Sequence, residues 1–176
     1  MKIRTSLSIL GLILLLLTSC SNPTTTQRDE STKVVETEKN FKVVATEESF
    51  PTNFDELSFK REETPHYQYL VQIVKSEDTL EELISLQNEL PSADNEEEDI
   101  LLISYEESGS CPQEIENIEY DNKGNLNLTL KNSGSICTSD ASPRTNIIFL
   151  DKKISQSLTH ATIHEGKTTT KVPIQK

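Results

Sequence analysis

The chain has 176 residues, a length that suits one domain with flanking segments. Its 17 basic and 29 acidic residues give a net charge of -12, which disfavours binding to the phosphate backbone of nucleic acids. Only 5 residues are glycine, and neither G-x-G-x-x-G nor G-x-x-x-x-G-K-S/T occurs, which excludes the common dinucleotide-binding and P-loop motifs. The 34% share of hydrophobic residues supports a modest core.

The N-terminal residues have the pattern of an export signal. A basic n-region precedes an apolar run over residues 7–17, which is too short to cross a bilayer as a stable helix. The following Leu17-Thr-Ser-Cys20 resembles the lipobox of bacterial lipoproteins, in which the cysteine receives lipid and becomes the new N-terminus. This predicts a signal peptide over residues 1–19 and lipidation of Cys20. An ordinary secretory leader and an N-terminal membrane anchor are the alternatives.

Residues 20–40 have the composition of a linker. The segment is polar, rich in threonine and mixed in charge, so it buries too little apolar surface to order itself. A flexible chain of this length would reach about 25 Å from the membrane. The rest of the chain, residues 41–176, is expected to form a single globular domain.

The first elements expected in this domain are strands. Residues 41–45 are a short strand candidate, and residues 50–60 are expected to form a loop with a strand at its end. Residues 66–75 are a stronger candidate, because residues with high β-propensity dominate the segment.

The apolar spacing then changes to a helical period. Ser76 or Asp78 can serve as the N-cap, and Glu81 stands at capping-box spacing from Asp78. The apolar residues Leu80, Leu83, Ile84 and Leu90 share one helical face. This is the only strongly amphipathic helix that the sequence predicts, and Pro91 is expected to end it.

The remaining segments are predicted to be strands separated by turns. The expected strands cover residues 100–105, 114–121, 126–130, 145–150, 158–164 and 168–174. All glycines beyond the leader fall between strands, which supports this division. The predicted fold class is mainly β (α+β): an antiparallel β-sandwich with one packed amphipathic helix, after an N-terminal signal helix and a flexible linker.

Two cysteines remain once Cys20 is assigned to lipid. Cys111 and Cys137 would meet oxidising conditions in an exported chain, so a disulfide between them is the simplest interpretation. Free thiols or a metal site are the alternatives, although C-x-x-C spacing and a nearby histidine are both missing.

The order of the predicted elements resembles the C-terminal domain of the protease-complex subunit PrcB family. The resemblance covers roughly residues 67–176. It rests on the order of these features: a strand, the start of the helix in Val74-Lys-Ser-Glu-Asp-Thr-Leu-Glu-Glu-Leu83, then Leu90-Pro91, and then the strand over 100–105. It implies one helix beside an antiparallel β-sandwich, export by bacteria, and binding to a secreted protease. The family's glycine-rich turn ending in tyrosine is replaced here by Glu107-Ser-Gly-Ser-Cys-Pro112, so no functional residue is carried over.

His160 and His164 are the most suggestive candidates for chemistry. Residues four apart share a face of a strand or a helix, so this pair could bind a metal or belong to an enzyme site. The pattern is not H-E-x-x-H, and the third histidine is distant in sequence. The acidic run Asp94–Asp99 lacks the calcium-loop pattern and is expected to be a solvated loop.

The sequence contains no constellation typical of an enzyme, since G-x-S-x-G is missing. The predicted function is therefore non-catalytic binding or stabilisation of a secreted or envelope protein, such as a protease. The protein is expected to use no cofactor, to bind no nucleic acid, and to be held by lipid on Cys20 at the extracytoplasmic face of a bacterial cell membrane. A metal-dependent or other enzyme site at His160 and His164, or a small-ligand-binding lipoprotein, is the alternative.

Overall fold

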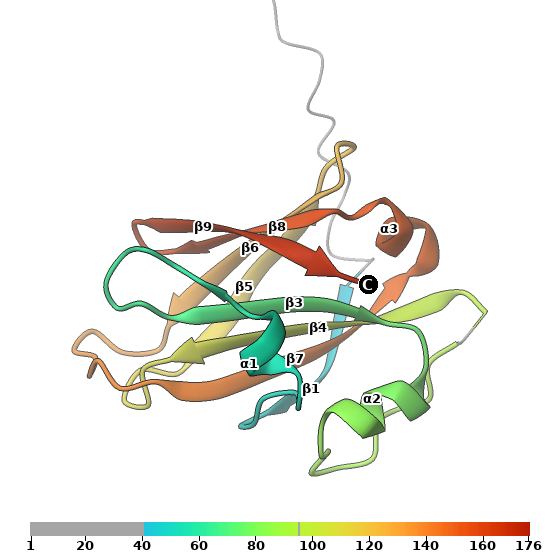
Figure 1. Cartoon of the computed structure of the whole chain (residues 1–176), viewed down its shortest axis with the longest axis horizontal. Coiled ribbons are helices and arrows are strands. Elements are labelled where there is room, and N and C mark those ends of the chain that lie inside the picture. The colour runs from blue at the N-terminus through green and yellow to red at the C-terminus, as the bar shows by residue number, and fades with distance from the viewer. Residues whose placement is uncertain (1–40, 95) are drawn as a thin grey trace, which may run out of the picture.

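A computed structural model describes residues 41–94 and 96–176, so the predicted signal peptide, Cys20 and the linker lie outside the described residues. No helix within these two ranges is long and apolar enough to cross a membrane. The elements of this part of the chain follow in the order β1 (Phe41–Glu47), α1 (Phe54–Leu57), β2 (Phe59–Lys60), β3 (Gln68–Val74), α2 (Glu77–Leu83), β4 (Glu98–Glu107), β5 (Gln113–Tyr120), β6 (Asn125–Asn132), β7 (Ser142–Asp151), α3 (Lys152–Ser157), β8 (His160–Glu165) and β9 (Thr168–Gln175) (Figure 1).

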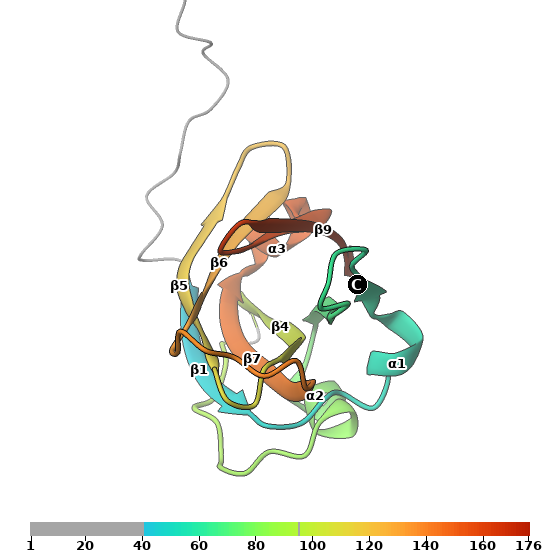
Figure 2. The same cartoon turned by 90° about the vertical axis from the view of Figure 1, so that its left-hand side faces the viewer.

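The strands form one curled sheet in the order β1-β7-β4-β3-β9-β8-β6-β5, with the short β2 also paired to β3. The curl turns the two halves of the sheet toward each other around a common interior (Figure 2). Its two end strands come close enough for the rings of Phe41 and Tyr120 to meet edge to face, with centroids 6.0 Å apart. The predicted mainly β fold with a packed helix is thus confirmed.

Two strand pairs differ from the antiparallel arrangement that the sequence predicts. β3 runs parallel to β9, and β6 runs parallel to β8, whereas the other pairs are antiparallel. The hairpins β5–β6 and β8–β9 were visible in the sequence because each is closed by a local turn. Pairing between strands that are distant in sequence leaves no such local signal.

The interior between the two halves is a continuous apolar core. On β6, the buried Leu126, Leu128 and Leu130 alternate with polar residues that are less buried, as expected for a strand with one buried face. The other core side chains come mainly from β3, β4, β7, β8 and β9, and two buried tyrosines, Tyr69 and Tyr105, lie among them.

A second apolar cluster lies on the outer face of the sheet. Here Leu80 of α2 and Ile84 pack against Ile100 and Leu102 of β4 and Phe149 of β7. The central strands β4 and β7 are therefore buried on both faces. This explains why each contains an uninterrupted apolar run, Ile100–Ile103 in β4 and Ile147–Leu150 in β7, rather than an alternating pattern.

The helix α2 is shorter than predicted. Ser76 caps it as expected, since its Oγ accepts a hydrogen bond from the backbone N–H of Thr79 at 3.3 Å. The helix ends at Leu83 instead of continuing to Pro91, and Ile84 is extended. The carbonyl of Leu83 accepts a hydrogen bond from the N–H of Thr52 at 2.8 Å, so a neighbouring segment satisfies the end of the helix. The apolar residues beyond it pack on the same cluster from an extended segment.

The short helices α1 and α3 were not predicted. Each spans at most two turns, too few residues for a periodic pattern to be visible. α3 follows β7 directly, and its N-cap Asp151 accepts a hydrogen bond from the N–H of Lys153 at 2.7 Å.

Candidate functional site

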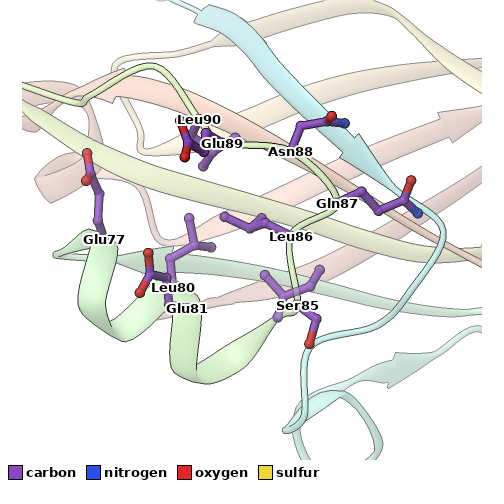
Figure 3. A pocket seen from close by; sticks show the side chains of 10 residues that line it. Glu77, Leu80, Glu81, Ser85, Leu86, Gln87, Asn88, Glu89 and Leu90 are labelled. Atoms are coloured by element: carbon purple, nitrogen blue, oxygen red, sulfur yellow. The ribbon is translucent and has the colours of Figure 1, made fainter.

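A groove lies between α2 and the irregular segment that follows it. We call it the α2 groove. Its volume is about 620 Å³ (Figure 3). The residues that line it are Glu77, Leu80, Glu81, Ile84, Ser85, Leu86, Gln87, Asn88, Glu89 and Leu90.

Hydrogen bonds from backbone N–H groups to glutamate side chains hold the segment after α2 in place. The N–H of Gln87 donates to Oε1 of Glu47 on β1 at 3.2 Å, and the N–H of Ala93 donates to Oε1 of Glu77 at 2.8 Å. Glu47 is almost completely buried, so this contact ties the segment to the edge of the sheet. The groove therefore has a preformed shape, although it lies in a connection between strands.

The α2 groove combines an apolar floor with an acidic rim. Leu80 and Ile84 are buried, while Leu86 and Leu90 are half-buried. The rim carries the carboxylates Glu77, Glu81 and Glu89, and none of the lining residues is basic. Such a surface is complementary to a segment that presents apolar side chains flanked by positive charges.

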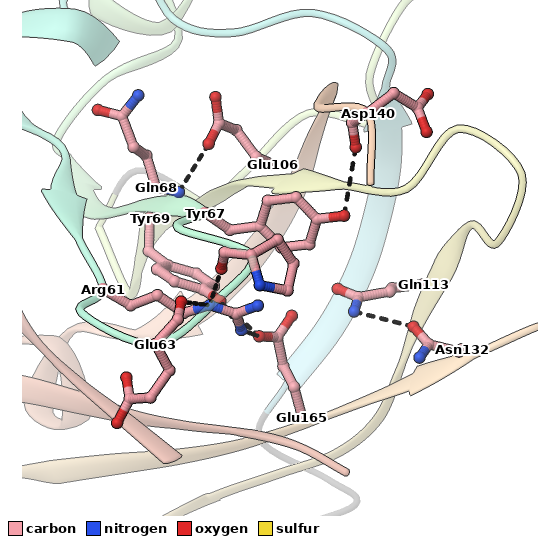
Figure 4. A network of polar contacts seen from close by, with 11 residues as sticks. Arg61, Glu63, Tyr67, Gln68, Tyr69, Glu106, Gln113, Asn132, Asp140 and Glu165 are labelled. Atoms are coloured by element: carbon pink, nitrogen blue, oxygen red, sulfur yellow. Dashed lines mark hydrogen bonds and ion pairs between the residues drawn. The ribbon is translucent and has the colours of Figure 1, made fainter. Parts of the chain in front are cut away.

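A second candidate site is a buried polar cluster between the segment that precedes β3 and the β8–β9 hairpin (Figure 4). Its centre is an ion pair between Arg61 and Glu165, whose side chains are only 5% and 8% exposed. Arg61 also donates to the hydroxyl of Tyr69 at 2.8 Å and to the carbonyl of Pro65, and Tyr69 donates to Glu165. The guanidinium lies over the ring of Tyr67, 4.9 Å from its centroid.

The tyrosines of this region are held in their neutral form. Burial raises the pKa of Tyr69 well above its usual range, and the negative charge of Glu165 raises it further. Burial likewise raises the pKa of Tyr105 and, to a smaller extent, that of Tyr67. All three hydroxyls therefore act as hydrogen-bond donors at neutral pH. Tyr67, for example, donates to the carbonyl of Asp140 at 3.2 Å.

The polar cluster opens into a cavity of about 270 Å³, which we call the mouth cavity. Four separate connections line it: the segment between β2 and β3, the start of β5, the loop between β6 and β7, and the β8–β9 hairpin. The disulfide stands at its wall, since Cys137 is one of the lining residues.

The structure confirms the predicted disulfide between Cys111 and Cys137. Their Cα atoms are 5.4 Å apart, within the range that disulfides usually span. The bond ties the start of β5 to the loop between β6 and β7. Gly134 lies against it, and a Cβ atom there would be only 2.8 Å from Sγ of Cys111. The glycine allows this close approach.

His160 and His164 share one face of β8, as predicted, while the residues between them alternate in burial. Strand geometry separates them, because four residues at about 3.3 Å each span about 13 Å. Each ring instead contacts a neighbouring threonine, Thr159 at 2.9 Å and Thr169 at 3.3 Å respectively. The strand therefore does not bring the two histidines together at one metal ion.

The acidic run between α2 and β4 does not gather into one site either. Asp99 at its end is buried and pairs with Lys75, with Nζ and Oδ2 2.9 Å apart, and it also accepts from Ser155. Across residues 41–94 and 96–176, no three His, Cys, Asp or Glu side chains form a group that could hold a metal ion.

Comparison with known proteins identifies no relative: no family model, no curated protein and no solved structure matches this chain. The resemblance to the PrcB family therefore stays a prediction. Arg61, Gln113 and Glu165 were missed by sequence analysis, because single polar residues more than 40 positions apart carry no local pattern.

Proposed function

We propose that this protein is a non-catalytic lipoprotein, anchored by lipid on Cys20 at the extracytoplasmic face of a bacterial membrane, that binds a secreted or envelope protein through the α2 groove. The observation that carries the proposal is the preformed groove itself, with its apolar floor and acidic rim. The pattern of the leader supports the anchor.

The chemistry of the groove defines the partner as a protein with an exposed apolar segment flanked by lysine or arginine. Burying one leucine-sized side chain on the floor would contribute about 1.5–3 kcal/mol. Exposed charge pairs with Glu77, Glu81 or Glu89 would add at most about 1 kcal/mol each, and salt would weaken them. The net charge of -12 also favours fast association with a basic partner.

The resemblance to the PrcB family suggests the first partner to test. It implies a protein that binds and stabilises a secreted protease, which agrees with a tethered domain that presents a groove. The partner's basic, apolar segment, and not its catalytic site, is the feature that the groove is proposed to recognise.

The anchor and the groove are tested in the same cells. Replacing Cys20 by alanine should abolish labelling with a clickable fatty acid and release the protein from the membrane fraction. A photocrosslinking residue at Asn88, an exposed position in the groove, should capture one specific protein, whereas the same residue at the exposed Lys123 between β5 and β6 should not.

Matched charge reversals separate the groove from the overall charge. Glu81→Lys/Glu89→Lys reverses the rim and should weaken partner binding about tenfold, with a smaller difference at high salt. Glu114→Lys/Glu119→Lys makes the same charge change on β5, outside the groove, and should leave affinity within about twofold. Equal losses in both variants, or labelled lipid on the Cys20→Ala protein, would refute the proposal.

A further inference from the structure

The mouth cavity contains two buried acceptor atoms that the protein itself leaves without a hydrogen bond. They are Oε1 of Glu165 and Oε1 of Gln113, which have no partner among the described residues. The side chain of Glu165 and the residue Gln113 are each only 8% exposed, and both line the same cavity. Buried polar atoms in folded proteins are nearly always paired, so two unpaired oxygens on residues that line one cavity indicate a bound group that supplies donors.

The other polar atom of each side chain already has a hydrogen-bond partner. Oε2 of Glu165 accepts from both Arg61 and Tyr69, and Nε2 of Gln113 donates to Asn132 at 2.9 Å. These contacts fix the orientation of both residues. The free oxygen of the carboxylate can only accept a hydrogen bond, so the missing group must be a donor.

The local charge favours a cationic donor over a neutral one. Arg61 and Glu165 cancel each other as an ion pair. Two more carboxylates are held beside residues of the cavity: Asp140 accepts a hydrogen bond from the lining residue Thr138, and Glu106 accepts one from the N–H of Gln68, next to the lining Tyr67, at 2.9 Å. The surroundings of the cavity therefore carry a negative excess.

We propose that the mouth cavity binds a primary ammonium group, with Glu165 and Gln113 as its acceptors. An ammonium has three N–H donors and no acceptor, which matches two orphaned oxygens in a negatively charged setting. The volume of about 270 Å³ equals that of roughly nine water molecules, enough for the ammonium and a short alkyl chain.

A small free amine and a lysine side chain of another protein both carry this group. The site shares no lining residue with the α2 groove, so it goes beyond the proposed function. Each proposal can fail without the other.

The test is a titration followed by NMR on the intact folded protein at neutral pH. n-Butylammonium should shift the side-chain amide signal of Gln113 saturably. Tetramethylammonium carries the charge without N–H donors, and n-butanol carries a donor without the charge, so both should bind at least about tenfold more weakly. The peptide acetyl-Gly-Lys-Gly-amide is titrated in the same way. If the peptide binds, a lysine side chain of another protein can supply the ammonium group. If only n-butylammonium binds, the ligand is a small free amine.

Variants locate the binding in the cavity. Glu165→Gln removes the charged acceptor with little change in shape and should weaken n-butylammonium binding at least about tenfold. Gln113→Leu leaves the Arg61–Glu165 pair intact and is the second variant, read out through neighbouring backbone amides, in case Glu165→Gln does not fold. Glu114→Gln, at an exposed position on β5, is the control and should bind normally.

Three results would each overturn the proposal: no saturable shift with either amine, equal affinity for tetramethylammonium, or unchanged affinity in both folded cavity variants. Loss of binding in Glu81→Lys/Glu89→Lys would also count against it, since these residues line the α2 groove instead.

Discussion

Removal of the disulfide should lower the melting temperature by about 12 °C. The perturbation is Cys111→Ala/Cys137→Ala, which opens a loop whose ends are 26 residues apart. The chain-entropy model assigns about 3.5 kcal/mol of stability to closing a loop of that size. A domain of about 136 residues has an unfolding entropy of about 0.29 kcal/mol/K near its melting temperature. Dividing the lost stability by this entropy gives the shift in melting temperature.

Differential scanning calorimetry on three samples measures this effect: the oxidised protein, the protein after reduction, and the double alanine variant. The reduced protein should show most of the shift, because reduction opens the loop and keeps both sulfur atoms. Cys111 is completely buried beside Gly134, so the alanine variant should melt a little lower still through lost packing.

Two outcomes would refute this reasoning. Mass spectrometry after alkylation could find two free thiols in the untreated protein, in which case the bond does not form. Alternatively, the reduced protein could melt within about 3 °C of the oxidised one, in which case the loop is already constrained in the unfolded chain and the entropic argument does not apply.

Two further predictions concern the core and the buried tyrosines. Leu80→Ala, in the floor of the α2 groove, should lower the free energy of unfolding by about 2–5 kcal/mol in urea titrations. Leu86→Ala, at a half-buried position, should lower it clearly less. Equal losses in the two variants would contradict the described packing. Because burial raises the pKa of Tyr69 and Tyr105 above the unfolded value of 10.0, the stability that their neutral forms provide is complete below pH 10 and is lost above it. Above pH 10, each tyrosine should lower the free energy of unfolding by about 1.4 kcal/mol per pH unit. In urea titrations at alkaline pH, the free energy of unfolding of Tyr69→Phe should therefore fall less steeply with pH than that of the unchanged protein. An unchanged slope would contradict this prediction.

The structural features that the sequence predicts correctly have local physical causes. The alternation of Leu126, Leu128 and Leu130 follows from the two-residue period of a strand with one buried face. The Ser76 cap follows from its hydrogen bond three residues along the chain. The helix was predicted too long because Leu90 continues the apolar period, while packing and a hydrogen bond from Thr52 end the helix at Leu83.

The parallel pairing of β3 with β9 and of β6 with β8 joins strands that are distant in sequence, so it depends on how the whole chain folds. The same holds for both candidate sites. The α2 groove depends on a hydrogen bond that ties Gln87 to Glu47, 40 residues away, and the polar cluster depends on the contact of Arg61 with Glu165, 104 residues away.

The amino-acid sequence by itself determined the mainly β class, the order of most elements, the disulfide partners and the absence of familiar nucleotide-binding motifs. These follow from short-range periodicity, turn residues and a count of three cysteines. The tertiary structure alone decided which strands are neighbours, where the chain leaves a groove, and which residues with unpaired buried oxygens line the mouth cavity. Burial and the encounter of distant side chains arise only when the chain is folded, because each depends on residues that no local pattern connects.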